Sequence, residues 1–384
     1  MHGTIESATE SAYEVEVRPL AELGSIEPEW RALAARALMP NVFYEPQFAL
    51  AAAPALGRNV SAGLVWLRGK AARLVGLFPT RIERHRYGLP WPIVVGWISP
   101  FAPLGVPLID REAAEPVIGA FLDHLASHRP RSMLLPMFPQ QGPLAAAFAT
   151  ALARRGGESI AFAPHARALL APAGERGSYL ERALPHKKLK ELGRQLRRLA
   201  DDGEVTWDIA REGTAIEAAL AEFLTLEAAG WKGRAGTAAG HDPAIRAFLE
   251  AAVPVLAGDG KAAIVRLTLA RHAVAALIVL RSGDTAWCWK IAYDERHARA
   301  SPGVQLMLHA TKALLADPGL AQVDSCADAD HPMIDHIWRE RLALADHLVR
   351  PGTSGRAAFA VTRALETTRR SAIATAKRGR DLLR

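Results

Sequence analysis

The chain has 384 residues, of which half are hydrophobic and 23% are charged, a composition typical of a globular protein with room for two domains. The formal net charge of +7 comes from the segment that begins at Arg350, where nine Lys and Arg residues stand against two acids. The preceding residues hold 38 of the 47 bases and 38 of the 40 acids, so this part of the chain has no net charge. This argues against a broad nucleic-acid-binding surface on residues 1–349.

The sequence predicts neither export nor insertion into a membrane. Its first seventeen residues are polar and acidic, unlike a signal peptide, and no window of eighteen apolar residues predicts a membrane span. The two cysteines, Cys288 and Cys326, both stand in apolar, strand-like segments. This favours reduced thiols inside a cytoplasmic protein.

Strand-like and helical runs alternate in the first half of the chain. A hairpin is predicted at 61–82, followed by a strand at 91–98, a helix near 112–128, a strand at 132–138, a helix near 142–155 and a strand at 159–170. Residues 171–178, rich in Gly and Pro, predict a linker. We therefore expect an N-terminal domain at 1–174, a C-terminal domain at 175–349 and a basic tail at 350–384.

A strongly basic helix is predicted just after the linker, in "HKKLKELGRQLRRLADDG". Leucines recur along it at three- and four-residue spacing, which indicates a face packed on a core. Basic residues recur beside them, among them Lys187, Lys190 and Arg194. This basic stripe is either a solvated surface or a binding surface for an anionic substrate, and we expect the latter if it walls the cleft between the halves.

The second half repeats the order of the first. A hairpin is predicted at 262–283, then a strand at 285–295, a helix at 302–316, a strand at 321–326 and a helix at 332–341. The two hairpins align at an offset of 200 residues without gaps. The shared order indicates a duplicated unit of the mixed α/β (α+β) class.

The strand at 285–295 leads into a possible phosphate site. Strict alternation would place Trp287, Trp289, Ile291 and Tyr293 on one face, with Cys288, Lys290 and Asp294 on the other. Ser301 is expected to cap the next helix and Pro302 to open it, while Gly303 would let an anion approach the free backbone N–H groups. Arg296 and Arg299 stand just before this helix start.

This order of elements resembles the GNAT acetyltransferase fold, and more closely its FemAB-like and CelD-like branch, whose members carry tandem GNAT units. Four segments match that branch in order, namely "KKLKELGRQLRRL", "LEAAGWKGRAGTA", "YDERHARASPG" and "VDSCADADHPMIDHIW". The resemblance implies that acyl-CoA, in the simplest case acetyl-CoA, binds here. The implied contacts are Arg296, Arg299, Ser301, Gly303, Val304 and Ile291. This sequence keeps only one of the motif's glycines.

Other candidate residues lie in two loops. Trp231 and Lys232 occupy a glycine-rich loop suited to closing over an anionic, partly apolar ligand. Asp324, Asp330 and His331 follow a strand end, where a carboxylate or imidazole could take a proton from the acceptor, and Tyr293 is a fourth catalytic candidate. Their spacing fits neither a calcium loop nor a zinc pattern, so no metal is expected.

The function implied by the resemblance is acyl transfer from acyl-CoA to an amine or hydroxyl. The acceptor is expected to be a small molecule or glycan, anionic and bound by Lys187, Lys190, Arg194, Trp231, Lys232 and Lys290, as in polysaccharide or cell-envelope biosynthesis. Two alternatives stay open: a Fem-type peptidyltransferase that uses aminoacyl-tRNA, and a non-catalytic scaffold for a polymer or membrane. The basic tail, with a weak apolar stripe at Ala357, Val361, Leu365 and Thr368, predicts peripheral contact with an anionic membrane.

Overall fold

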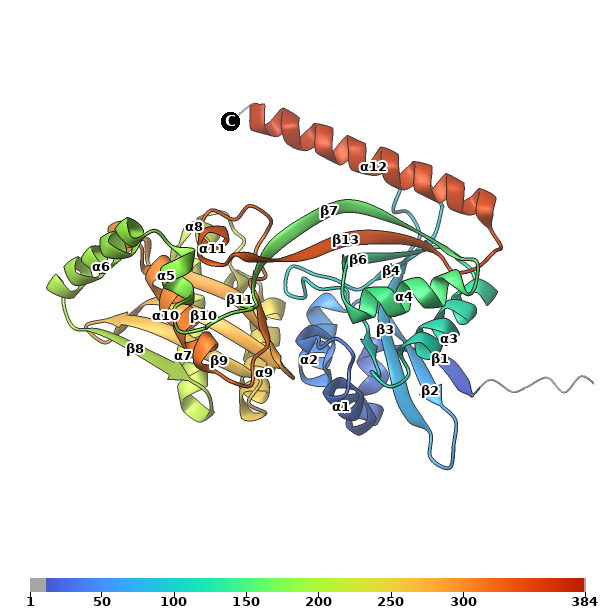
Figure 1. Cartoon of the computed structure of the whole chain (residues 1–384), viewed down its shortest axis with the longest axis horizontal. Helices are drawn as coiled ribbons and strands as arrows, with labels where there is room; N and C mark the ends of the chain where they lie inside the picture. The colour runs from blue at the N-terminus through green and yellow to red at the C-terminus, as the bar shows by residue number, and fades with distance from the viewer. Residues whose placement is uncertain (1–11, 383–384) are drawn as a thin grey trace, which may run out of the picture.

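The computed structural model describes residues 12–382, with side chains up to residue 379. Figure 1 shows an elongated molecule in which two α/β halves lie side by side. The strands are β1 (Tyr13–Pro19), β2 (Ser61–Leu67), β3 (Arg73–Glu83), β4 (Ile93–Gly96), β5 (Leu108–Ile109), β6 (Met133–Pro139), β7 (Glu158–Leu170), β8 (Val205–Ala210), β9 (Ala262–Leu269), β10 (His272–Ser282), β11 (Thr285–Tyr293), β12 (Gln322–Asp324) and β13 (Glu340–Arg350).

The α-helices are α1 (Glu27–Ala35), α2 (Pro46–Leu56), α3 (Ala114–Ser127), α4 (Pro143–Ala153), α5 (Tyr179–Ala183), α6 (His186–Asp201), α7 (Gly213–Ala229), α8 (Trp231–Arg234), α9 (Pro243–Gly258), α10 (Pro302–Ala316), α11 (Ile334–Ile337) and α12 (Arg356–Leu382). Short 3-10 helices are η1 (Leu20–Ile26), η2 (Val42–Tyr44), η3 (Ala239–His241) and η4 (Glu295–Ala300). None of these helices, within residues 12–382, is long and apolar enough to cross a bilayer.

The same strand arrangement occurs twice in one continuous sheet. In the N-terminal half, β1 to β4 pair antiparallel with their neighbours and β6 joins β4 in parallel. In the C-terminal half, β8 to β11 pair antiparallel and β12 joins β11 in parallel. The predicted duplicated unit of mixed α/β class is thereby confirmed.

The two halves exchange their last strands. β7, the final strand of the first half, pairs with β12 of the second, and β13, the final strand of the second half, lies between β6 and β7. Figure 1 shows β7 and β13 running together as a long ribbon across the junction. The boundary expected after residue 174 stays a prediction, but residues 340–350 complete the sheet of the N-terminal half.

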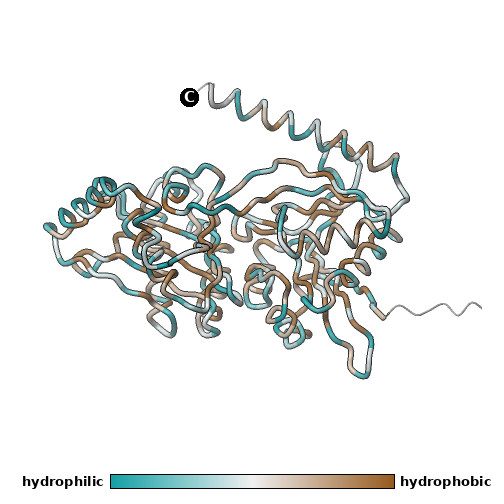
Figure 2. The backbone as a smooth tube through the Cα atoms, in the orientation of Figure 1, coloured by the Kyte–Doolittle hydropathy of each residue, from teal (hydrophilic) through white to brown (hydrophobic). Residues whose placement is uncertain are grey.

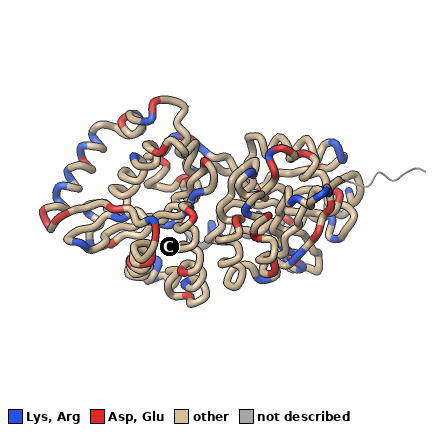
Figure 3. Tube along the Cα trace, turned by 90° about the horizontal axis from the view of Figure 1, so that it is seen from below, with Lys and Arg blue, Asp and Glu red and all other residues tan. Residues whose placement is uncertain are grey.

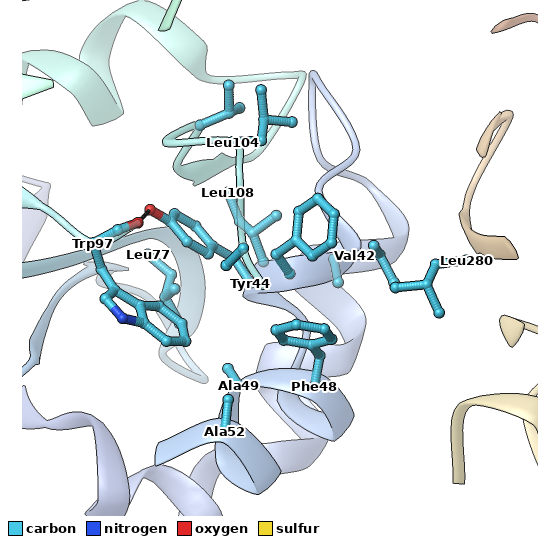
Figure 4. Packing of buried hydrophobic residues seen from close by; sticks show 14 of the residues in the cluster. Val42, Tyr44, Phe48, Ala49, Ala52, Leu77, Trp97, Leu104, Leu108 and Leu280 are labelled. Carbon is cyan, nitrogen blue, oxygen red and sulfur yellow. Dashed lines mark hydrogen bonds between the residues drawn. The ribbon is translucent and has the colours of Figure 1, made fainter. Parts of the chain in front are cut away.

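A shared hydrophobic core joins the halves below this ribbon. Phe48 of α2 contacts Trp289 of β11 and Phe248 of α9, with ring centroids 5.5 and 5.2 Å apart. Such edge-to-face pairs each contribute roughly 1 kcal/mol beyond the area that they bury. Figure 4 shows the N-terminal part of the cluster, which Leu280 of β10 also enters. Figure 2 shows hydrophobic residues concentrated in the strands of both halves.

The prediction of a helix at 332–341 is wrong. Only the single turn α11 forms there, and the chain then becomes β13. Ile334 and Ile337 are buried, and the indole of Trp338 donates to Thr311 Oγ1 of α10 at 3.0 Å, which fixes the turn against α10. From residue 340 onward, pairing with β6 and β7 on both sides favours the extended conformation.

Only one end of α12 is packed on the body. Phe359, Thr362 and Glu366 recur at helical spacing and are at most 3% exposed. The indole of Trp91 donates to Thr362 Oγ1 at 2.9 Å. Val361, in the apolar stripe predicted from the sequence, is 44% exposed because it lies away from this docked face. Residues 371–379 are all exposed, and membrane contact by this segment stays a prediction.

The buried carboxylate of Glu366 anchors α12. Arg86 donates two hydrogen bonds to it, at 2.9 and 3.1 Å, and Arg370 donates another at 2.6 Å. Burial alone would raise the pKa of Glu366, but Arg86 and then Arg370 hold this pKa below its ordinary value. The stabilisation is therefore complete near neutral pH and is lost as pH falls through the lowered pKa.

Replacing Glu366 with Ala should lower the free energy of unfolding by about 2 kcal/mol, because Arg86 and Arg370 lose their shared carboxylate and Arg86 keeps only its bond to Glu83. It should also release α12, which limited proteolysis would detect as early cleavage after residue 350. Arg363→Ala, at an exposed position of the same helix, is the control. Equal stability and equal cleavage in both variants would contradict an anchoring role for Glu366.

Candidate active site

The sheet of the C-terminal half opens where β11 and β12 separate. Their parallel pairing covers only three residue pairs and ends at Trp287 and Asp324. β12 stops there, whereas β11 continues to Tyr293. From Cys288 onward, no strand within residues 12–382 lies beside β11 on that side, so its backbone groups are available to a ligand.

A β-bulge in β11 redirects the side chains next to this opening. β10 pairs Ile278 with Lys290 and Val279 with Cys288, so Trp289 is the extra residue. Trp287 and Trp289 pack in the core shared by both halves, but Ile291 packs in the cluster under α10. The prediction that Ile291 shares a face with the two tryptophans is wrong, because one inserted residue reverses the alternation.

Lys290 and Trp289 both reach a loop of the N-terminal half. The indole of Trp289 donates to the carbonyl of Phe101 at 2.8 Å, and Lys290 Nζ donates to the carbonyl of Pro100 at 3.2 Å. Lys290 Nζ also lies 4.1 Å from the centroid of the Phe101 ring. The two halves thus meet directly at the side chain of Lys290.

The environment of Lys290 lowers the pKa of its amino group. Burial, and then the neighbouring Lys232, lower its pKa to about 8. Within residues 12–379, no carboxylate forms an ion pair with Lys290. An amine with this pKa exchanges protons near neutral pH, which suits a general base.

The predicted glycine-rich loop begins with the one-turn helix α8. Glu295 accepts hydrogen bonds from the Trp231 backbone N–H and from Arg234, both at 2.7 Å. Lys232 Nζ pairs at 2.7 Å with Glu227, whose other oxygen accepts from the Ala239 N–H. The Trp231 side chain is 56% exposed. These bonds hold an exposed indole and a cation beside β11.

The N-terminus of α10 has free backbone donors. Ser301 adopts a left-handed conformation and its hydroxyl makes no capping bond, so its expected role as a side-chain cap is wrong. Pro302 has no N–H, and the first intrahelical bond runs from Gln305 to the Ser301 carbonyl. The N–H groups of Gly303 and Val304 therefore lack helical partners. The dipole of α10 favours an anion at this end.

Two arginines and a tyrosine border this helix start. Arg296 donates to Asp294 at 2.7 Å, whereas Arg299 is exposed and has no ion pair within residues 12–379. A Cβ placed on Gly303 would lie 3.2 Å from the Tyr293 ring, so that ring packs on the glycine. Arg299 is thus the cation available to a ligand at the start of α10.

The basic helix α6 lies at the outer end of the C-terminal half. Figures 1 and 3 show it far from the N-terminal half, with Lys and Arg along its length. It packs against η4 and α10, where the Gln305 side chain donates to the Leu192 carbonyl at 2.7 Å. The prediction that Lys187, Lys190 and Arg194 wall the cleft between the halves is therefore wrong in its location. Their role in substrate binding stays a prediction.

Asp324 forms a buried ion pair with Arg167 of β7. Both side chains are at most 3% exposed, and Arg167 also donates to the Pro103 carbonyl at 3.0 Å. The other oxygen of Asp324 accepts from the Cys326 N–H at 2.9 Å. Burial raises the pKa of the Cys326 thiol well above its ordinary value. The Asp324 carboxylate is therefore already bound within the protein, which disfavours its predicted role as a base.

Asp330 and His331 lie in the connection between β12 and α11. Asp330 is exposed, and His331 Nδ1 accepts from the Met333 N–H at 3.3 Å. Neither forms a hydrogen bond or ion pair with Lys290 or Asp324 in the described structure. No group of three or more His, Cys, Asp or Glu residues suited to a metal ion occurs among the described residues.

The corresponding opening in the N-terminal half is filled by its own chain. β4 and β6 pair at Val94–Met133 and Val95–Leu134 and then diverge. A Cβ on Gly105 would lie 2.0 Å from the Pro136 carbonyl oxygen, so the segment after β4 packs directly against β6. Asn41 fixes this segment by donating to the carbonyls of Leu104 and Val106.

Sequence reasoning missed four residues of the site. Arg167 stands in an apolar strand, where a lone arginine signals a buried partner, but the sequence does not identify that partner. Pro100 and Phe101 come from the other half, and no local pattern connects them with Lys290. Glu227 lies within the segment that resembles the family, where the sequence pattern indicates only Trp231 and Lys232 as candidates.

Comparison with known proteins agrees with this geometry. Residues 186–331 match the Acetyltransferase (GNAT) domain family. No curated protein sequence matches. Solved structures share the fold at low identity: FemX, with 10% identity and a TM-score of 0.52, covers 84% of this chain and 95% of its own. The C-terminal domain of a protein named as a lysylphosphatidylglycerol synthetase from Agrobacterium fabrum has 11% identity and a TM-score of 0.53, covering 88% and 95%.

A third solved structure, L-PGS from Bacillus licheniformis, has 12% identity and a TM-score of 0.51, and the match covers 88% of this chain and 96% of that one. Because these matches extend over most of each chain, the similarity covers both halves and not the family-matched domain alone. The predicted resemblance to FemAB-like tandem GNAT proteins is therefore confirmed at the level of the fold.

Asp324→Asn separates a structural from a catalytic role for this carboxylate. We expect the free energy of unfolding to fall by about 3–5 kcal/mol, because the amide leaves Arg167 as an unpaired buried charge. Chemical denaturation measures this change, with Asp202→Asn, an exposed carboxylate without an ion pair within residues 12–379, as the control. Unchanged stability would contradict the structural role and would return Asp324 to the catalytic candidates.

Proposed function

We propose that this protein, whose residues 186–331 match the Acetyltransferase (GNAT) domain family, is an acyltransferase that transfers an acyl group from acyl-CoA to an amine or hydroxyl of an anionic acceptor. The acyl group would be acetyl in the simplest case, and the acceptor a glycan or other component of the cell envelope. The observation that carries this proposal is the opening between β11 and β12 beside the uncapped start of α10.

The geometry of α10 supports the placement of the donor. The free N–H groups of Gly303 and Val304 suit a pyrophosphate, because they combine hydrogen-bond donors with the positive end of a helix dipole. Arg299, which has no ion pair within residues 12–379, adds a positive charge. The uncovered edge of β11 would hold the extended arm of the donor and direct the thioester toward Lys290. The single glycine of this sequence therefore still fits an acyl-CoA site.

The proposed reaction is direct transfer. The acceptor nitrogen or oxygen attacks the thioester carbonyl carbon, the carbon–sulfur bond breaks, and CoA leaves as a thiolate that takes up a proton. A backbone N–H on the open edge of β11 would stabilise the oxygen that gains charge. Neutral Lys290 would accept the proton that the acceptor loses.

A side chain beside the opening supports a sugar acceptor. Lys232 lies next to β11 but is paired with Glu227, whereas the exposed indole of Trp231 offers a flat apolar surface of the kind on which sugar rings stack. Loops of both halves meet here, since Lys290 contacts the carbonyl of Pro100. We infer that the acceptor enters between the Trp231 helix and the 100–103 loop.

A second candidate, an aminoacyl-tRNA donor, is favoured by the position of α6. Its exposed bases lie next to η4 and the start of α10, where the anionic end of the donor would sit. Among the fold neighbours, the name lysylphosphatidylglycerol synthetase describes an aminoacylated lipid product. A polyanionic donor would therefore find a longer basic surface than the pyrophosphate of CoA requires.

Thermal-shift titration of the full chain with acetyl-CoA and with aminoacyl-tRNA tests the proposed donor. We expect acetyl-CoA to raise the melting temperature of the wild type but not that of Gly303→Glu, whose carboxylate repels the pyrophosphate. Gly303→Gln, which has the same size without the charge, separates electrostatic from steric loss. Stabilisation by aminoacyl-tRNA alone would favour the second candidate, and no response to either donor would contradict acyl transfer.

The role of Lys290 predicts a defined pH dependence. With acetyl-CoA and glucuronate, an anionic sugar with no group of its own that titrates near pH 8, the rate of CoA release should rise with pH through a midpoint near pH 8, as Lys290 becomes neutral, to a plateau at higher pH. Lys290→Gln should lower this rate by roughly 10²–10⁴-fold. Lys232→Gln should move the midpoint to higher pH, because Lys232 contributes to the low pKa of Lys290. An unshifted midpoint in Lys232→Gln and an undiminished rate in Lys290→Gln would exclude Lys290 as the base.

A further inference from the structure

A second pocket lies in the N-terminal half, apart from the candidate active site. It has a volume of about 670 Å³ and lies between the β1–β4 face of the sheet and the C-terminal end of α3. This volume falls within the range typical of small-molecule sites. The pocket belongs to the half whose own opening between β4 and β6 is filled, so acyl transfer does not account for it.

The floor of the pocket is apolar and unusually exposed. Val17 and Ile82 line it with 52% and 49% of their surface exposed, and both are among the few large hydrophobic residues so exposed in the described structure. Phe121 and Leu125 of α3 form the wall behind them. Phe121 approaches Gly63 so closely that a Cβ there would lie 2.6 Å from the ring. The glycine therefore lets the wall lie directly on the sheet.

The rim of the pocket is basic. Arg84 and Arg129 are exposed and have no ion pair within residues 12–379, whereas Arg81 is bound to Glu83 at 2.7 Å. His124 and His128 stack with ring centroids 4.1 Å apart. Burial, and then His128, lower the pKa of His124, so the two arginines supply the positive charge at neutral pH. No Asp or Glu is among the described residues that line this pocket.

We propose that this pocket binds an amphiphilic anion, namely an alkyl chain with a terminal phosphate or carboxylate. The chain would cover Val17 and Ile82, and the charged end would lie between Arg84 and Arg129. The apolar floor disfavours a purely ionic ligand such as inorganic phosphate. Such a ligand would leave Val17 and Ile82 exposed to water and would gain nothing from the hydrophobic effect. The unpaired arginines disfavour a neutral hydrocarbon, because burying them without a counter-ion is costly.

Isothermal titration calorimetry of the full chain tests this site with three probes, all below micelle-forming concentrations. Decyl phosphate should bind, whereas 1-decanol and inorganic phosphate should each bind at least tenfold more weakly. The variant Arg84→Ala with Arg129→Ala should lose at least tenfold in affinity for decyl phosphate, and Ile82→Asp should lose as much. Arg211→Ala, an exposed arginine of the other half, should bind like the wild type.

Three results would overturn the proposal. Unchanged affinity in the double arginine variant or in Ile82→Asp would place the ligand elsewhere. Equal affinity for decyl phosphate and inorganic phosphate would reduce the site to an anion contact. Binding to phosphatidylglycerol vesicles without binding of monomeric decyl phosphate would indicate a membrane surface. Circular dichroism melting of each variant ensures that a loss reflects the site rather than unfolding.

Discussion

The buried ion pair between Arg167 and Asp324 fixes the geometry on which the site depends. It joins β7 of the first half to β12 of the second at the point where β11 and β12 separate. Arg167 also holds the Pro103 carbonyl, close to the Pro100 and Phe101 groups that contact Lys290. A buried ion pair is stable only when its two charged groups keep a close, well-aligned contact, because water cannot compensate for a lost contact. The pair therefore tolerates little displacement of either strand.

The two halves share one strand arrangement, but it is open to a ligand in the C-terminal half and filled in the N-terminal half. In the C-terminal half, a short β12 and the bulge at Trp289 leave the edge of β11 open. In the N-terminal half, the segment around Gly105 occupies the equivalent space. α3 has Glu115 in its first turn, which disfavours an anion there, and Arg111 before it donates to the carbonyls of Arg36 and Ala35. Arg299, which precedes α10, forms no ion pair within residues 12–379. The N-terminal half instead contributes the 100–103 loop to the site of its partner half.

Local patterns predicted much of the fold and part of the site. The hairpins at 61–82 and 262–283 were predictable because alternation and turn residues act over short distances. The helix start at Pro302 was predictable for the same reason, although the left-handed Ser301 was not, since its conformation depends on η4 packing before it. The bulge at Trp289 was not predictable, because it arises from the register between β10 and β11. The position of α6 also depends on contacts with α10 that its own periodicity does not reveal.

The exchange of β7 and β13 has a consequence for how the chain acquires its structure during synthesis. The N-terminal half has most of its strands once residue 170 has emerged, but the place between β6 and β7 stays vacant until β13 arrives some 170–180 residues later. At the usual elongation rate of about 5–20 residues per second, the edges of β6 and β7 wait for roughly 10–35 seconds. Unpaired strand edges readily join other chains. The chain is therefore most prone to aggregate during synthesis on the ribosome, before β13 has paired, rather than after folding is complete.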